Sequence, residues 1–291
     1  MNLEEQIKNY RKQSGMSQEQ MADKIGVSRQ AITKWENGTG VPDISNLIAI
    51  AELFHVSLDE LLLDQKNDKK QSEYLYESIT EYDIDRVKNF DMKLQGAYSV
   101  SVRSYNGEKI KIILSSNTLQ RLQSDYKIKI DDIKNRIDVE LQRFNGASEA
   151  SAKEGMIITV YLPRIYIGKI ELSVNAKTLK LFELITDSFE LDGKVSEVIL
   201  EEGKGDVEIN SHLDMTVTVR SHEGSIEINQ ISSTSKLFVP TGYPFRAIKK
   251  GIGTSISYEN NGKKVDDFSD NQADNTIELN GMKSELVISM L

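Results

Sequence analysis

Residues 17–38 read SQEQMADKIGVSRQAITKWENG, and this stretch predicts two short helices joined by a tight turn. Ser17 is followed three residues later by Gln20, which is the pattern of a capping box at the start of a helix. Gly26 then interrupts the apolar spacing. Glycine readily takes the left-handed backbone conformation that often follows the last turn of a helix. Ser28 supplies the N-cap of the next helix. The stretch therefore predicts a helix, a turn and a second helix.

Further helices are predicted on both sides of this pair. An apolar i, i+4, i+7 stripe begins at Leu3. After the pair, Pro42-Asp43 opens a fourth helix, and a second capping box, Ser57 with Glu60, opens a fifth. We expect residues 1–64 to form an all-α domain of five helices. The residues of the fourth helix expected to face inward are Ile44, Leu47, Ile48, Ala51 and Leu53.

The pattern changes after this domain. Residues 65–75, QKNDKKQSEYL, have no apolar periodicity and are predicted to be a linker. Beyond them the apolar residues alternate, which is the period of β-strands. The segment YSVSVRSYNGEKIKIIL predicts two strands joined by a hairpin turn at Asn106-Gly107. Residues 76–291 are therefore expected to form an all-β domain.

Two interleaved series of apolar triplets repeat along the β region. In the first, a glutamate stands between two apolar residues, and the glutamates are 19, 18 and 19 residues apart. In the second, the triplets are 19, 19 and 20 residues apart. A repeat of this length with two short strands predicts a β-solenoid whose rungs stack in parallel. The first series is centred on Glu171, Glu190, Glu208 and Glu227, and the second on Lys180, Ile199, Thr218 and Phe238.

If the rungs are in register, the four glutamates stand about 4.8 Å apart, the spacing of neighbouring strands. Two readings of this column are open: a solvated face relieved by neighbouring lysines, or a surface for a cation or a basic partner.

The two ends of the stack are also predicted. Residues 277–279 and 286–288 match the triplets and are expected to form a terminal rung, with a loop over residues 259–276. Strands from residues 85–165 are expected to cover one end of the stack. A second copy of the chain is a candidate for the other end.

Composition excludes several kinds of active site. The 291 residues contain no cysteine, so no disulfide, zinc-thiolate site or cysteine nucleophile is possible. No carboxylate cluster of the kind that cleaves polysaccharides is apparent. His212 and His222, with nearby acids, allow a metal site, but two exposed turn histidines are the simpler interpretation. We expect no catalysis, no cofactor and no metal.

Charge and hydropathy restrict the partners. The net charge is −9, and residues 1–64 are themselves net −4, so any contact with nucleic acid must be local. No targeting segment and no apolar run of about 20 residues is present, so we expect a soluble, cytoplasmic protein without a membrane partner.

The segment quoted first resembles the helix-turn-helix of the XRE family, the Cro/cI-type regulators. Ala22 matches the small residue where the two helices cross, and Gly26 matches the turn glycine. Ile32 and Trp35 match the apolar residues that press the second helix onto the domain. The resemblance extends over residues 3–63. It implies a lambda-repressor-like fold that binds double-stranded DNA.

The family pattern implies a role for each position. Gln18 is expected to anchor a phosphate, and the backbone of Asn37 to meet another. On the exposed face of the second helix of the pair, Arg29 is suited to guanine, Gln30 to adenine and the Thr33 methyl to a thymine methyl. The pattern also implies a buried ion pair between Arg11 and Glu36. The residues expected to contact DNA are Gln18, Ser28, Arg29, Gln30, Thr33, Lys34 and Asn37.

Residues 90–291 have a resemblance of their own. The segments VYLPRIYIGKIELSV and LFVPTGYPFRAIKKGIG resemble a bacterial adhesin-like β-solenoid domain of unknown function. This resemblance implies a fold without a chemistry.

Together these observations predict a sequence-specific transcriptional regulator that binds double-stranded DNA as a homodimer. The β domain is expected to supply dimerisation, or sensing of an unknown effector or protein partner. The alternative is an interaction, scaffold or antitoxin-like protein whose DNA-binding domain serves autoregulation.

Overall fold

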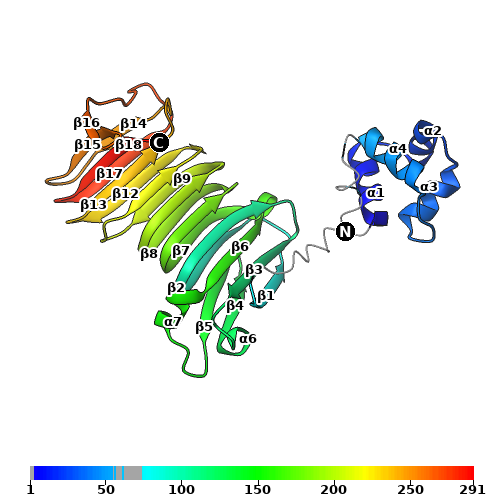
Figure 1. Cartoon of the computed structure of the whole chain (residues 1–291), viewed down its shortest axis with the longest axis horizontal. Coiled ribbons are helices and arrows are strands. Elements are labelled where there is room, and N and C mark those ends of the chain that lie inside the picture. The colour runs from blue at the N-terminus through cyan, green and yellow to red at the C-terminus, as the bar shows by residue number, and fades with distance from the viewer. Residues whose placement is uncertain (1–2, 55, 57–60, 62–73) are drawn as a thin grey trace. The chain divides into compact units, whose positions relative to one another are not determined.

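The computed structural model describes residues 3–54, 56, 61 and 74–291. The chain divides into two compact units, Met1–Glu73 and Tyr74–Leu291 (Figure 1). Most of the predicted linker lies outside the described residues, as does the fifth helix apart from Leu61, which is helical and fully buried. None of the helices in the described residues is long and apolar enough to cross a membrane.

The first unit is helical, as predicted. Its helices pack around one apolar core, to which every helix contributes. The core residues without exposed surface are Ile7, Met21, Ile32, Ile50 and Leu61. The helices are α1 (Leu3–Gln13), α2 (Gln18–Ile25), α3 (Arg29–Glu36) and α4 (Ile44–Phe54).

Local signals set the helix ends where the sequence predicts them. The Ser17 hydroxyl accepts from the backbone N–H of Gln20, whose side chain accepts from the backbone N–H of Ser17. Gly26 ends α2 with a left-handed φ of 74°. The Ser28 hydroxyl caps α3 by accepting from the backbone N–H of Ala31. The two predicted helices and the turn between them are therefore confirmed.

The predicted inward face of α4 is partly wrong. Ile44 and Ile48 are 75% and 40% exposed, whereas Leu47, Ile50 and Ala51 are buried. Because α4 is apolar on more than one side, its spacing alone does not identify the buried face.

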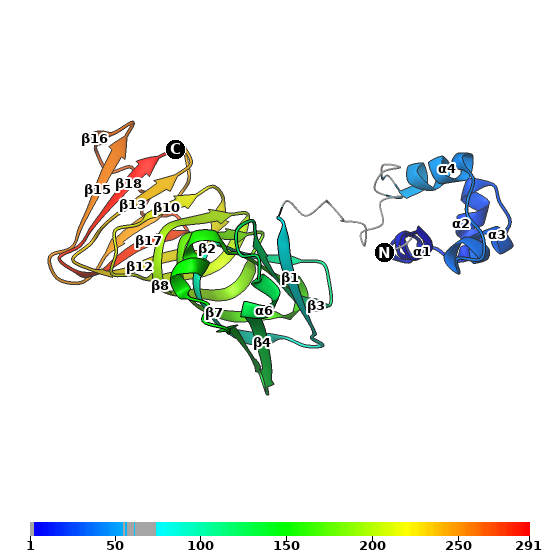
Figure 2. The same ribbon diagram turned by 60° about the horizontal axis from the view of Figure 1, so that its bottom comes forward.

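The second unit is a β-solenoid in which most neighbouring strands pair in parallel (Figure 1 and Figure 2). Short helices α6 (Leu122–Asp125) and α7 (Glu149–Gly155) and a 3₁₀ turn (Arg164–Tyr166) interrupt the strands. The strands are β1 (Tyr76–Asp83), β2 (Lys88–Tyr105), β3 (Lys109–Ser116), β4 (Tyr126–Ile133), β5 (Arg136–Arg143), β6 (Ile157–Pro163), β7 (Ile167–Phe182), β8 (Ile185–Glu201), β9 (Gly203–Asn210), β10 (Thr216–Val219), β11 (His222–Glu223), β12 (Ser225–Ile231), β13 (Thr234–Val239), β14 (Arg246–Lys249), β15 (Ser255–Asn260), β16 (Lys263–Val265), β17 (Thr276–Met282) and β18 (Glu285–Met290).

Rungs stack with the register that the repeat predicts. The long strands β2, β7 and β8 each make a rung by bending, and later rungs combine two strands, such as β9 with β10. Alternate apolar side chains point into the solenoid and are buried. One buried column joins Ile170, Phe189, Val207 and Ile226, and another joins Leu179, Val198, Val217 and Leu237.

The predicted terminal rung lies inside the stack. β17 pairs with β12 on one side and β14 on the other, and β18 pairs with β13 and β15. The chain therefore forms its outermost rung from β14 and β15 first. β17 and β18 then form the rung that lies between this outermost rung and the rung of β12 and β13. The predicted loop over residues 259–276 is interrupted by β16, which pairs with β15.

The chain itself covers part of this end of the solenoid. The ring of Phe268 packs edge-on against Phe245 at 5.8 Å and Tyr258 at 5.1 Å between ring centroids. A second copy is not required to fill the space next to these aromatic rings.

The predicted hairpin at Asn106-Gly107 is also wrong. β2 and β3 follow one another in the sequence, but β6 lies between them, parallel to β2 and antiparallel to β3. Val160 of β6 is thus the partner of both Val102 and Ile112. An alternating pattern identifies a strand, but it does not identify the neighbour with which that strand pairs.

A column of eight carboxylates crosses the stack. The four predicted glutamates are paired in register, and the column continues at both ends. Cations pair with the added residues: Lys129 with Asp131 and Arg136 with Asp138, each at 2.5 Å, Lys93 with Asp91 at 3.2 Å, and Lys250 with Glu278 at 2.7 Å. The whole column is Asp131, Asp138, Asp91, Glu171, Glu190, Glu208, Glu227 and Glu278.

In the middle of the column, asparagines take the place of the expected lysines. Asn210 donates to Glu190 at 3.0 Å, and Asn229 donates to Glu208 at 2.8 Å. Burial raises the pKa of Glu190 above its usual value, and the neighbouring carboxylates, Glu208 first, raise it further. Among the described residues, lysine and arginine thus pair with the carboxylates added on either side of the four glutamates, and asparagines bond those in the middle.

His222 is not an exposed turn residue. It is buried, and its Nε2 lies 2.9 Å from the backbone oxygen of Gly205. Burial lowers the pKa of His222 below its usual value, so the ring is neutral near pH 7. The side chain belongs to the packing of the solenoid.

Candidate nucleic-acid interface

One face of α3 is buried and the other is exposed. Ile32 and Trp35 point into the core of the helical unit, which fixes the rotation of the helix about its axis. Gln30 and Lys34, each two positions from Ile32, therefore lie on the opposite side of the helix. Both are exposed, as are Arg29 in the first turn, Ser28 before the helix and Asn37 after it, while Thr33 is half-buried.

Arg29 has one weak charged contact. Its Nη1 lies 3.9 Å from Oε2 of Glu19, and both side chains are about two-thirds exposed. A pair this open to solvent contributes little and is easily exchanged. The guanidinium is thus available to a ligand approaching the exposed face of α3.

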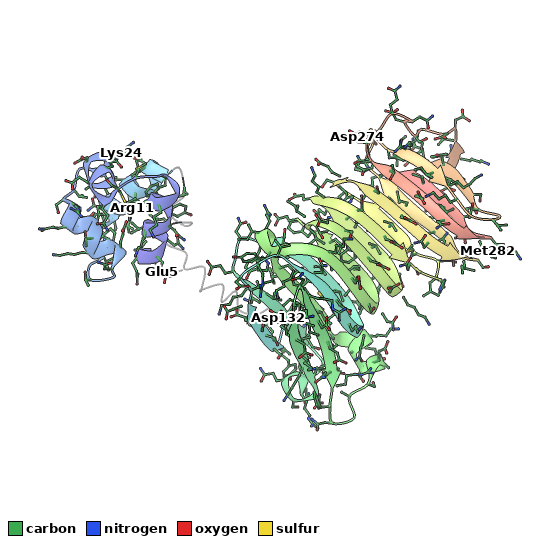
Figure 3. All side chains as sticks on the ribbon, turned by 180° about the vertical axis from the view of Figure 1, so that it is seen from behind. Glu5, Arg11, Lys24, Asp132, Asp274 and Met282 are labelled. Atoms are coloured by element: carbon green, nitrogen blue, oxygen red, sulfur yellow. The ribbon has the colours of Figure 1, made fainter. Side chains whose placement is uncertain are left out.

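The predicted ion pair between α1 and α3 is confirmed. Arg11, labelled in Figure 3, donates from Nε and Nη2 to the two carboxylate oxygens of Glu36 at 2.5 and 2.9 Å. Its third nitrogen donates to the backbone oxygen of Met16 at 2.7 Å. Burial acts to raise the pKa of Glu36, but the hydrogen bonds from Arg11 and Gln18 outweigh it and hold the pKa below its usual value. Glu36 is therefore an ionised acceptor inside the domain.

Gln18 does not point freely into solvent. Its Nε2 donates to Oε2 of Glu36 at 2.8 Å, and its Oε1 accepts from the Thr33 hydroxyl at 3.2 Å. Gln18 lies 15 positions before Thr33 and 18 positions before Glu36, on a different helix. The spacing of residues within one helix therefore could not predict these contacts.

The start of α2 has the properties of an anion site. The backbone N–H groups of Gln18 and Glu19 have no hydrogen-bond partner among the described residues, whereas that of Gln20 is capped by Ser17. Free N–H groups in a first helical turn attract phosphate oxygens. The first turn of α2 and the exposed face of α3 together offer groups that suit a DNA backbone and its base edges.

Known proteins are similar in sequence to the helical unit. The helix-turn-helix family matches residues 7–61. Over 96 residues the chain is 35% identical to the transcriptional repressor RstR of cryptic phage CTXphi in Vibrio cholerae, a match that covers 33% of this chain and 86% of RstR. The chain belongs to the XRE-type helix-turn-helix family. The family match covers residues 7–61, so the helix-turn-helix domain occupies only part of this chain.

Solved structures are similar to each unit of this helix-turn-helix regulator. The P22 c2 repressor, solved in complex with a synthetic operator, is 32% identical, and the match covers 21% of this chain and 94% of that chain with a TM-score of 0.21. A protein provisionally described as a cell adhesion protein, from Clostridium sporogenes, is 13% identical, and the match covers 74% of this chain and 99% of that chain with a TM-score of 0.36.

Proposed function

We propose that this regulator binds a specific operator in double-stranded DNA, in the cytoplasm, through the exposed face of α3. The observation that carries the proposal is the orientation of α3. Its apolar residues are buried, so Arg29, Gln30 and Lys34 project from the domain together. Side chains of these types distinguish base edges in the major groove.

The first turn of α2 and the end of α3 supply the backbone contacts in this proposal. Gln18 and the free N–H groups beside it hold one phosphate, and the backbone after α3, at Asn37, approaches another. In this proposal Ser28, which caps α3, lies at the boundary between protein and DNA.

The β unit holds two copies of the chain together in this proposal. A single helix-turn-helix contacts few base pairs, so two half-sites read by a dimer give the required specificity. The acidic charge of residues 1–64 makes such coupling more important, because general attraction to phosphate is weak.

Arg29→Ala tests the base-reading assignment. On a duplex that carries the operator, we expect a loss of about 1–3 kcal/mol in binding free energy, because a bidentate contact to a base is removed. On a random duplex the loss is expected to be small. Fluorescence anisotropy with both duplexes measures the two affinities.

Lys24→Ala is a matched control, since it removes one exposed cation from α2 and not from the exposed face of α3. An equal loss of affinity for both duplexes in Arg29→Ala would show that Arg29 does not read bases.

A further inference from the structure

The side-chain amide of Gln18 is held from two sides. Glu36 accepts from its nitrogen at 2.8 Å, and Thr33 donates to its oxygen at 3.2 Å. Both partners belong to α3, whereas Gln18 is the first residue of α2. The two contacts fix the side chain across the junction of the two helices.

The orientation of this amide follows from the charge of Glu36. Arg11 donates two hydrogen bonds to the Glu36 carboxylate, which is buried and ionised and therefore only accepts. Gln18 must then turn its NH₂ group toward Glu36, and its carbonyl oxygen is left for Thr33. The buried ion pair thus selects one of the two orientations of the amide.

The hydroxyl of Thr33 has a single proton, and that proton is engaged inside the domain. Besides Gln18, the backbone oxygen of Arg29 lies 3.0 Å from it. Thr33 is also half-buried, in contrast to Arg29 and Gln30 on the same face. Its hydroxyl is therefore not free to donate to a base.

One donor of Gln18 remains. The second N–H of its Nε2 has no partner among the described residues, and it lies in the same first turn as the free backbone N–H groups of Gln18 and Glu19. A side chain fixed before binding loses less conformational entropy when it contacts a ligand.

We propose that Thr33 is a positioning residue for the phosphate contact of Gln18 and does not read a base itself. This inference rests on the proposed binding of DNA. It is an alternative to the expectation that the Thr33 methyl touches a thymine, and it makes Thr33 and Glu36 the two sides of a clamp on Gln18.

Two substitutions of Thr33 separate the two roles. Thr33→Ser keeps the hydroxyl and loses the methyl, so we expect affinities within about twofold of the wild type. Thr33→Val keeps the shape and loses the hydroxyl, so we expect a loss of about five- to tenfold on both operator and random duplexes. Because a phosphate contact is weakened, the slope of log K against log salt should also become shallower, by up to about 1.

A Gln18→Ala background completes the test in the full chain. If Thr33 acts through Gln18, Thr33→Val should cause no further loss when Gln18 is already Ala. The fluorescence of Trp35, the single tryptophan of the chain, shows whether each variant keeps the core of the helical unit.

The opposite pattern overturns the inference. A base reader predicts that Thr33→Ser loses affinity for the operator alone while Thr33→Val retains it. A loss in Thr33→Val that persists unchanged in the Gln18→Ala background also overturns it. A wild-type protein without affinity for any duplex removes the proposed function itself, which distinguishes that failure from the failure of the clamp.

Discussion

Ile226→Asp is expected to unfold the β unit and to leave the helical unit folded. Ile226 is fully buried and lies in register between Val207 and Ile277 of the neighbouring rungs. An unpaired carboxylate at this position costs several kcal/mol, in addition to the lost apolar packing. That loss is comparable with the 5–15 kcal/mol by which folded domains are typically stable.

Two spectroscopic signals report the two units separately. Far-UV circular dichroism follows the β-sheet, which belongs to the second unit, and Trp35 fluorescence follows the helical core. Glu227→Gln is the matched control, because Glu227 follows Ile226 in β12 and its side chain points out of the solenoid. A wild-type unfolding transition of the β-sheet in Ile226→Asp would contradict the stacked interior.

Separating the helical unit from the β unit is expected to lower operator affinity by about 10²–10⁴-fold. In the full chain a dimer makes the second half-site contact intramolecular, whereas residues 1–73 must make each contact independently. The acidic charge of residues 1–64 gives the isolated unit little general attraction to compensate.

Sedimentation of both proteins and titration on one duplex measure this effect. The full chain should sediment as a dimer and residues 1–73 as a monomer. Equal affinities, or a monomeric full chain, would leave the β unit without a part in DNA binding and would favour the interaction-protein alternative.

Local chemistry explains which parts of the helical unit could be predicted. The capping box of Ser17 and Gln20 and the turn at Gly26 depend on residues close in sequence, so the pattern specifies them. The buried face of α4 depends on which apolar side meets the other helices, and Ile44 and Ile48 show that spacing does not decide it.

The β unit shows the same division between local and long-range information. The repeat predicts register, because each rung places its apolar residues at the same steps. It does not predict order, because β6 enters between β2 and β3, and β17 enters between β12 and β14, without a change of period.

The candidate site divides in the same way. The exposed face of α3 follows from its buried apolar residues, so Arg29 and Gln30 could be placed from the sequence. The clamp on Gln18 depends on how α2 crosses α3, and no pattern within either helix reports that crossing. The family resemblance therefore suggested a base contact for the Thr33 methyl, and it gave no sign that the Thr33 hydroxyl is engaged inside the domain.

Selection of duplexes from a random DNA pool by the purified full chain tests the central claim most directly. The account predicts enrichment of one sequence with two related half-sites about one helical turn apart. It also predicts that Arg29→Ala relaxes the enrichment at one position of each half-site. A pool that emerges without any enriched sequence would contradict the claim that this chain recognises an operator.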